Sequence, residues 1–182
     1  MRELSLNILD ISQNSLTAGA KLIRISVEAD TERDLLAITI EDDGEGMEGW
    51  LVERASDPFV TTRKTRPVGM GLPLFKQAAE LIGGRFEIRS KKGEGTVVRA
   101  QFIISSIDRM PLGSIEDTVT ALLQSGAEIE LEFTVDGRGF RFDSEQIKRE
   151  LDADDISDWA TISCLKEYIK ENIQSVLGGV TL

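Results

Sequence analysis

The chain has 182 residues, 41% of them hydrophobic and 29% charged, which suits one globular domain with a small addition. It contains no histidine, which excludes imidazole catalysis, histidine-ligated zinc and phosphohistidine chemistry on the chain itself. The net charge of −11 argues against a nucleic acid or an anionic membrane as a partner.

No leader-like segment opens the chain and no run of about 18 apolar residues occurs in it, so we expect a soluble, cytoplasmic protein. The single cysteine, Cys164, cannot close an intrachain disulfide, which agrees with a reducing compartment. We expect Cys164 to be a small thiol of the core.

The first hundred residues alternate between helical and strand patterns. Leu4, Ile8 and Ile11 recur at helical spacing and predict a helix over residues 4–16, which Gly19 ends. The next patterned segments are two strands, a short helix, a longer helix and two more strands, at 22–27, 35–40, 50–55, 72–82, 86–89 and 97–104. This order predicts an α/β (α+β) two-layer sandwich, in which helices pack on one face of a single sheet.

The charge changes near residue 105. Residues 1–104 carry 16 acidic and 14 basic side chains, whereas residues 105–182 carry 16 and 7, a net charge of −9. The second part starts a new pattern of a helix, a hairpin about Asp136-Gly137 and two further helices at 144–151 and 158–177. We therefore predict a first domain over 1–104 and a small α+β C-terminal appendix over 105–182.

The predicted first helix carries unusual polar residues. Asp10 and Asn14 are four residues apart and Asn7 precedes Asp10 by three, so the three side chains share one stripe of the helix. A solvated face would more often hold Lys, Glu and Arg, which are better helix formers. Taken alone, the stripe is still more often a solvated face than a set of ligands.

Three loops carry further candidate residues. The loop "EDDGEGM" has the form Asp42-x-Gly44-x-Gly46-Met47; a carboxylate at a strand end can accept a hydrogen bond from an exocyclic amine, although Asp-Asp-Gly is also a common turn. In "VGMGLPL", a glycine pair precedes a helix, where N–H groups and the helix dipole favour phosphate, although such a pair is equally an ordinary loop. The basic segment "TTRKTR" is either a solvated loop or a lid that meets polyphosphate.

These signals occur in one order: Asp10-x-x-x-Asn14, Asp42-x-Gly44-x-Gly46, the basic segment, Gly69-x-Gly71-Leu72 and Gly93-Glu94-Gly95-Thr96. Together they resemble the N, G1, G2 and G3 boxes of the GHKL superfamily of ATPases, which includes DNA gyrase, heat-shock chaperones, histidine kinases and mismatch-repair ATPases. The resemblance covers residues 3–104. The segment from "DPFVTTRKT" to "KKGEGT" is similar to sensor histidine kinases, and "NSLTAGAKLIRISV" to the mismatch-repair proteins. The resemblance to the GHKL superfamily implies a Bergerat-type mixed sheet with helices on one face.

The resemblance also implies a role for each matching residue. Asp42 would accept the adenine N6 amine, Gly44 and Gly46 would let the strand end approach the base, and Thr96 would join the hydrogen bonds around adenine. Met47 would be an apolar wall.

Toward the phosphates, Asn14 would give its amide oxygen to Mg²⁺, and Lys64 would neutralise the triphosphate. The N–H groups that would face the triphosphate belong to four consecutive residues, of which Leu72 would also be an apolar wall: Gly69, Met70, Gly71 and Leu72.

Asp10 departs from the pattern of the relatives that hydrolyse ATP, many of which carry Glu at this position. The missing methylene withdraws the carboxylate by roughly 1.5 Å, and a misplacement of about 1 Å can cost roughly 100-fold in rate. We expect no phosphoacceptor histidine domain, since the first helix starts near residue 3 and histidine is absent.

Two functions therefore remain open. The first is a stand-alone kinase or slow ATPase that uses ATP and Mg²⁺ on a separate protein, much as anti-sigma-factor kinases of this superfamily phosphorylate a serine, with Asp10 as catalytic residue. The second is a non-catalytic ATP-sensing module that regulates a partner by ordering its lid. The acidic C-terminal region is a docking surface for a basic partner, a homodimer interface or simply a solvated subdomain.

Overall fold

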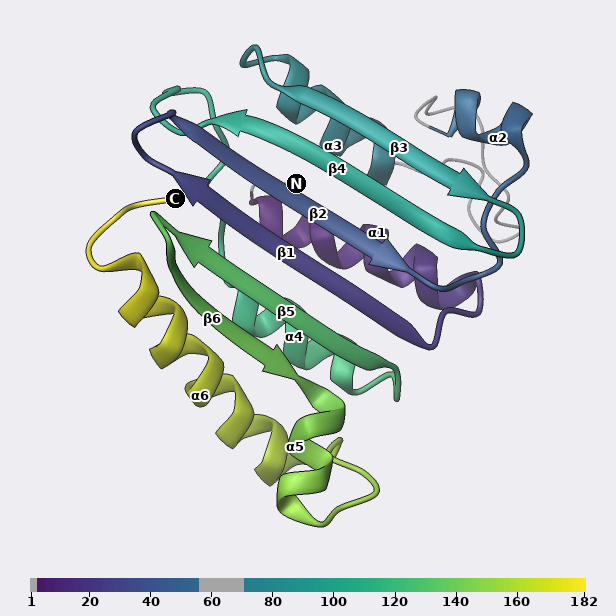
Figure 1. Ribbon diagram of the computed structural model, residues 1–182, viewed down its shortest axis with the longest axis vertical. Helices are drawn as coiled ribbons and strands as arrows, with labels where there is room; N and C mark the ends of the chain where they lie inside the picture. The colour runs from purple at the N-terminus through teal and green to yellow at the C-terminus, as the bar shows by residue number, and fades with distance from the viewer. Residues whose placement is uncertain (1–2, 56–70) are drawn as a thin grey trace.

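The computed structural model describes residues 3–55 and 71–182 (Figure 1). The strands in this part of the chain are β1 (Leu22–Asp30), β2 (Leu35–Asp42), β3 (Arg85–Lys91), β4 (Gly95–Ile103), β5 (Glu128–Val135) and β6 (Arg138–Asp143). The helices are α1 (Leu4–Thr17), α2 (Gly49–Arg54), α3 (Gly71–Glu80), α4 (Ile115–Leu123), α5 (Ser144–Leu151) and α6 (Trp159–Leu177).

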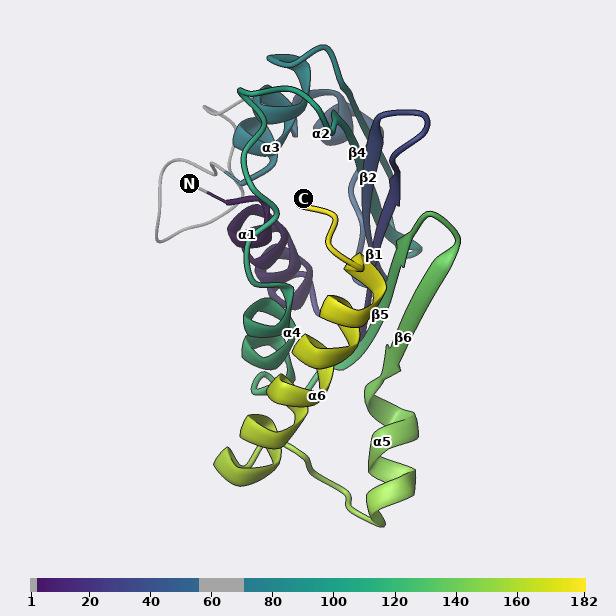
Figure 2. The same cartoon turned by 90° about the vertical axis from the view of Figure 1, so that its left-hand side faces the viewer.

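All of these strands belong to one sheet, in the order β3-β4-β2-β1-β5-β6. The pair β1 and β5 is parallel and the other neighbours are antiparallel, so the sheet is mixed. Seen edge-on in Figure 2, α1, α3, α4 and α6 lie on the same side of the sheet. The predicted two-layer α+β sandwich with helices on one face is confirmed.

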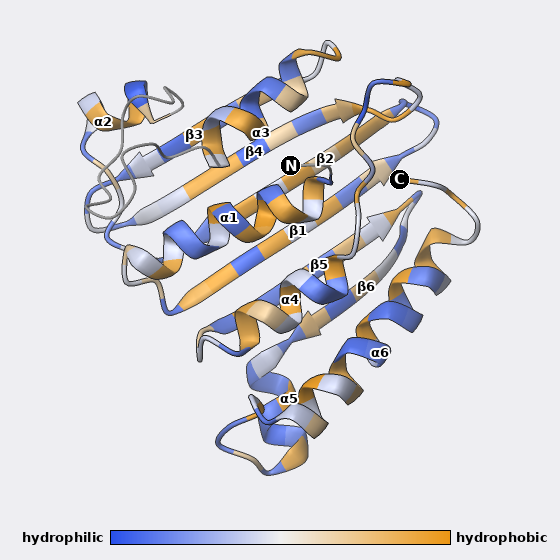
Figure 3. Cartoon of the chain, turned by 180° about the vertical axis from the view of Figure 1, so that it is seen from behind, coloured by the Kyte–Doolittle hydropathy of each residue, from blue (hydrophilic) through white to orange (hydrophobic). Residues whose placement is uncertain are grey.

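The alternation of residues along β1 explains the two layers. Ile23, Ile25 and Val27 are buried, whereas Arg24 and Glu28 between and beyond them are exposed on the open face. Side chains alternate across a strand, so β-branched residues at every second position supply one apolar face. Figure 3 shows the helix-covered side, where apolar residues recur along the strands and the inner helices.

The C-terminal region continues the same sheet and core. β5 runs parallel to β1, with Ile25 opposite Leu131, and residues of both belong to one cluster of buried apolar side chains. The segment before α4 also supports the start of α1, because the Leu4 N–H donates to the Pro111 carbonyl at 3.0 Å. The predicted division at residue 104 therefore falls within a single continuous sheet, and it stays a prediction as a domain boundary.

The prediction for Cys164 is wrong, because this side chain is exposed. The buried stripe of α6 is formed by apolar residues at helical spacing, among them Leu165 and Ile169, and Cys164 lies off that stripe. None of the helices within 3–55 and 71–182 has the length and apolar character that crossing a membrane requires.

Two carboxylates hold together loops from different parts of the chain. Their lowered pKa values indicate that the stability of the fold depends on pH in the acid range. The hydroxyl and N–H of Ser105 hold the pKa of Asp34 below its usual value, and the N–H and hydroxyl of Thr31 do the same for Asp136. A carboxyl with a lowered folded-state pKa contributes stability that is present above its unfolded pKa of about 3.9 and is lost as the pH falls through the folded value. We expect the unfolding midpoint to fall as the pH is lowered below about 5.

Denaturant unfolding between pH 2.5 and 7 measures this effect. Asp136→Asn should make the unfolding midpoint fall less steeply as the pH is lowered. Replacement of the exposed Asp108 by asparagine should leave this pH dependence unchanged. An equally steep fall of the unfolding midpoint in wild type and in Asp136→Asn would contradict the contribution of the contact between Thr31 and Asp136 to stability.

Candidate functional site

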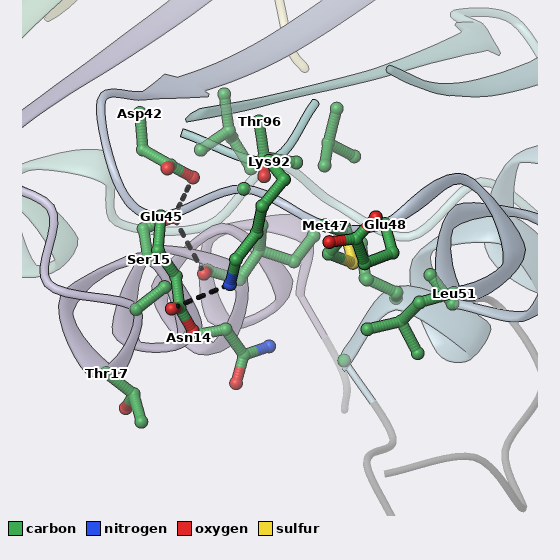
Figure 4. A pocket seen from close by; sticks show the side chains of 18 of the residues that line it. Asn14, Ser15, Thr17, Asp42, Glu45, Met47, Glu48, Leu51, Lys92 and Thr96 are labelled. Carbon is green, nitrogen blue, oxygen red and sulfur yellow. Dashed lines mark hydrogen bonds and ion pairs between the residues drawn. The ribbon is translucent and has the colours of Figure 1, made fainter. Parts of the chain in front are cut away.

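A cavity of about 480 Å³ opens between α1, the end of β2, α2, the start of α3 and the turn between β3 and β4 (Figure 4). This volume lies within the range of small-molecule sites. The residues predicted from the sequence that line it are Asn14, Asp42, Gly46, Met47, Gly71, Leu72 and Thr96. Segments far apart in the sequence therefore meet in one pocket.

Asp42 ends β2 at the inner wall of this pocket, with only 9% of its surface exposed. The Ser15 hydroxyl donates to its Oδ2 at 2.5 Å (Figure 4), and the Gly44 N–H donates to its Oδ1 at 2.9 Å. An ionised carboxylate has about four acceptor positions, so these two donors leave others for a ligand. The carboxylate is thus fixed in direction and can still accept a hydrogen bond.

Asp43, the next residue, serves the fold rather than the pocket. Its Oδ1 accepts from the N–H groups of Lys21 at 2.7 Å and Leu22 at 2.9 Å, at the start of β1. These hydrogen bonds, with that of Leu22 the largest cause, lower the pKa of Asp43. Two adjacent carboxylates therefore have separate tasks, and only Asp42 lines the pocket.

The loop after β2 needs glycine at position 46. Gly46 has φ +62°, and a Cβ there would overlap the backbone carbonyl of Lys91 in the facing hairpin. The loop is held to that hairpin because the Met47 N–H donates to the Ser90 hydroxyl at 2.9 Å. Ser90 is also 2.9 Å from the Thr96 hydroxyl, so Thr96 belongs to a network that includes the loop.

The base of the pocket is apolar around these polar groups. Asp42 and Thr96 are paired across β2 and β4, and Ile40 and Val98 are paired two residues farther along. All four line the pocket. A flat, largely apolar ring with one exocyclic amine fits such a combination of apolar floor and carboxylate acceptor.

The opposite wall is formed by α1 and the start of α3. Asn14 lines the pocket, while Asp10, one turn earlier, lies against Gly71. A Cβ at Gly71 would overlap Oδ2 of Asp10, so the absence of a side chain at Gly71 leaves room for this carboxylate. Asp10 is therefore adjacent to the pocket without being one of its lining residues among those described.

The oxygen atoms near the pocket determine whether Mg²⁺ fits this site. No group of three or more Asp, Glu, Cys or His residues in the described ranges could hold a metal ion. Mg²⁺ usually keeps several waters and binds through one or two protein oxygens plus substrate phosphates. Asn14, with an amide oxygen at the pocket wall, fits an ion that arrives with a nucleotide. Magnesium itself stays a prediction.

Other predicted site residues have different positions. Gly44 is not among the lining residues but orients Asp42 through its N–H. Lys64, Gly69 and Met70 lie outside the described residues. Ser15 is singled out by none of the sequence motifs; only its contact with Asp42, 27 residues away in the sequence, reveals its role.

The predicted polar stripe of α1 includes a residue that is fully buried. Asn7 is 0% exposed, and neither of its side-chain polar atoms has a hydrogen-bond partner among the described residues; the same holds for the Ser12 hydroxyl. The interpretation of this stripe as a wet face is therefore wrong for Asn7. Its spacing from Asp10 places it on the same side of α1.

We expect Asn7→Leu to stabilise the fold by about 1–3 kcal/mol, because a buried amide without a partner carries its desolvation cost. Urea unfolding measures the change in the free energy of unfolding. Ser12→Ala is the matched control on α1, with a smaller gain expected since it removes one unpartnered hydroxyl. A destabilised Asn7→Leu variant would show that this amide is hydrogen-bonded in solution.

Comparisons with known proteins agree with this geometry. The family model described as histidine kinase-, DNA gyrase B-, and HSP90-like ATPase matches residues 1–106. An uncharacterized sensor-like histidine kinase of Rhizobium meliloti is 39% identical over 79 residues, covering 41% of this chain and 15% of the relative. The alginate biosynthesis sensor protein KinB of Pseudomonas aeruginosa is 34% identical over 87 residues, covering 47% of this chain and 15% of the relative.

Another curated relative, a probable C4-dicarboxylate sensor kinase of Bacillus subtilis, is 40% identical over 73 residues, covering 40% of this chain and 14% of the relative. The match thus spans about 15% of the length of these curated relatives. A crystal structure of the N-terminal domain of a DNA repair protein has a TM-score of 0.51 at 13% identity, covering 79% of this chain and 52% of that one, and shows likeness of fold alone.

The family model covers more than half of the chain, and the pocket lies within the matched residues. The chain therefore belongs to the family of histidine kinase-, DNA gyrase B- and HSP90-like ATPases, in which it is an ATP-binding, kinase-like module.

Proposed function

We propose that the protein binds Mg-ATP in this pocket and acts as a kinase, or as a slow ATPase, on a separate partner protein. The observation that carries the proposal is the buried carboxylate of Asp42 on an apolar floor, oriented by the Ser15 hydroxyl and the Gly44 N–H. That arrangement supplies an acceptor for an adenine amine. Asn14 and Asp10 stand on the other side, where the phosphates would lie.

Each part of the nucleotide then has a proposed partner. Asp42 accepts from the adenine N6 amine, while Met47 and Leu72 form apolar walls. The N-terminus of α3, which begins at Gly71, has N–H groups without an acceptor inside the helix and a positive dipole end for the phosphates. Asn14 holds Mg²⁺, which when bound neutralises phosphate charge.

Asp10 is the proposed catalytic residue. Its carboxylate lies beside the first residue of α3, next to the proposed phosphate position. There it orients or deprotonates the hydroxyl of an incoming side chain or water. The acceptor belongs to another protein in this proposal, and a histidine acceptor in these 182 residues is excluded by composition.

The C-terminal region is proposed to hold the partner. Residues 105–182 carry a net charge of −9, which suits a basic surface of a partner protein, with a second copy of the chain as the alternative occupant. We place this encounter in the cytoplasm.

Transfer of label from γ-³²P-ATP to a protein that co-purifies with the chain tests the proposal. We expect a labelled partner that depends on the wild-type chain and on Mg²⁺. ATP binding without transferred phosphate and with negligible hydrolysis would overturn the kinase and leave the second candidate.

That second candidate is an ATP-sensing binding module. The observation that favours it is Asp10 itself, because its side chain is one methylene shorter than the Glu of many ATP-hydrolysing relatives and lies against α3. In that case ATP would change the affinity for the partner without turnover. Partner affinity measured with ATP and with a non-hydrolysable analogue should then be equal.

A further inference from the structure

Lys92 lies on the turn between β3 and β4 and lines the pocket, although none of the sequence motifs singles it out. Among the described residues that line the pocket, it is the one basic side chain, and three lining residues are acidic: Asp42, Glu45 and Glu48. A nucleotide triphosphate carries several negative charges. A cation on this wall therefore attracts its phosphates, in addition to any metal ion that arrives with it.

Lys92 is held in the pocket by Glu45. Its Nζ lies 2.9 Å from Oε2 of Glu45, and Figure 4 shows its side chain extending from the turn toward Glu45 and Asn14. The backbone of Glu45 is fixed separately, because its N–H donates to the Ala18 carbonyl at 2.9 Å and its carbonyl accepts from the Gly93 N–H at 2.7 Å. The loop thus keeps its shape when the ion pair opens.

The ion pair is well suited to exchange. The side chains of Lys92 and Glu45 are 52% and 65% exposed, and an ion pair this exposed contributes little to stability. A phosphate group carries more charge than a carboxylate and offers more acceptor oxygens. The Lys ammonium on its flexible four-carbon stem can turn from one anion to the other without backbone movement.

We propose that Lys92 binds the phosphates of the nucleotide and that Glu45 is its counter-ion when the pocket is empty. This inference rests on the proposed function, since it assigns one more contact to the same site. Lys92 supplies charge that the acidic lining residues lack, and Glu45 keeps the ammonium directed into the pocket. It is a binding residue, distinct from the proposed catalytic Asp10.

The neighbouring Lys91 provides a matched control. It has the same charge and lies at the same turn, but it pairs with Glu94 and does not line the pocket. Removing either lysine changes the net charge of the protein equally. A difference between the two variants therefore reports the pocket contact rather than long-range electrostatics.

Calorimetric titration of adenosine, ADP and ATP into the full chain tests the inference. Lys92→Ala should weaken ATP binding by roughly 10-fold, ADP by less and adenosine not at all. Lys91→Ala should stay within about 2-fold of wild type for all three ligands. Glu45→Gln should bind ATP as tightly as wild type or more tightly, because a like charge near the phosphates is removed.

The outcomes separate this inference from the function on which it rests. If the wild type binds ATP, and Lys92→Ala either loses equal affinity for all three ligands or loses none, the role of Lys92 alone would be overturned. A wild-type chain that binds none of the three ligands would overturn both. ATP affinity should also be measured at several salt concentrations. If it falls less steeply with salt in Lys92→Ala than in Lys91→Ala, the phosphate contact is further supported.

Discussion

Replacement of Asp42 by alanine is expected to weaken ATP binding by roughly 10- to 150-fold. Its carboxylate is the proposed acceptor of the adenine amine, and a hydrogen bond to a charged group contributes about 1.5–3 kcal/mol. The carboxylate is buried and already oriented by Ser15 and Gly44, whereas the other acidic lining residues, Glu45 and Glu48, are exposed. Equilibrium titration with a fluorescent ATP analogue measures the loss.

The same substitution also acts on the fold. Without Asp42, the Gly44 N–H loses its acceptor and the Ser15 hydroxyl keeps only the Ile11 carbonyl at 3.4 Å; a group left buried and unpaired costs about 1–3 kcal/mol of stability. Circular dichroism and urea unfolding therefore accompany the titration. Asp42→Asn separates the effects, since its amide oxygen can still accept from one donor while its amide nitrogen repels the adenine amine.

Asp43→Ala is the control for Asp42→Ala. It removes a carboxylate at the next position that accepts from Lys21 and Leu22 and does not line the pocket. We expect lower stability and unchanged ATP affinity in the folded fraction. If Asp43→Ala weakened ATP binding as much as Asp42→Ala, or if folded Asp42→Ala bound ATP normally, the adenine assignment would be wrong.

Residues that the chain places by local rules were predictable from the sequence. Asp42 follows a β-branched run and precedes two glycines, so the strand end, the turn and a carboxylate acceptor at the strand end follow from nearest neighbours. The position of Gly71 at a helix start also follows from its neighbours, because a glycine pair precedes a helical pattern there. The structure adds the reason for its size, which is the carboxylate of Asp10 from another helix.

Residues whose roles depend on distant segments were not predictable. Ser15 acts on Asp42 only because α1 crosses the end of β2, and Ser90 joins Met47 to Thr96 only in the observed register of β3 and β4. Lys92 is one of two adjacent lysines that the sequence does not distinguish; the direction of the hairpin turn puts one in the pocket. Local patterns carry no such information.

The position of the C-terminal hairpin is another case. Its two strands were predicted from alternation about Asp136-Gly137, but alternation does not say which strand they join. The pairing of β5 with β1 is parallel and spans about a hundred residues, which requires the crossover through α4. It extends the sheet beside α1, so the acidic region adjoins the helix that carries Asp10 and Asn14.

The second large effect is expected for Asp10. Asp10→Asn should lower phosphate transfer or hydrolysis by at least roughly 100-fold, because an amide cannot take a proton from the attacking group. ATP affinity should change by less than about 3-fold, since Asp10 is not among the lining residues described. Single-turnover transfer and ATP titration on the same preparations measure the two quantities separately.

Gln13→Ala is the control for Asp10→Asn. Gln13 is exposed and is not among the described residues that line the pocket, so we expect its removal to leave both binding and turnover unchanged. Equal turnover in Asp10→Asn and wild type, with tight ATP binding in both, would remove the catalytic role of Asp10 and favour the ATP-sensing module. In that case the carboxylate beside Gly71 would shape the start of α3 rather than act on a hydroxyl, and ATP would control partner affinity by occupancy alone.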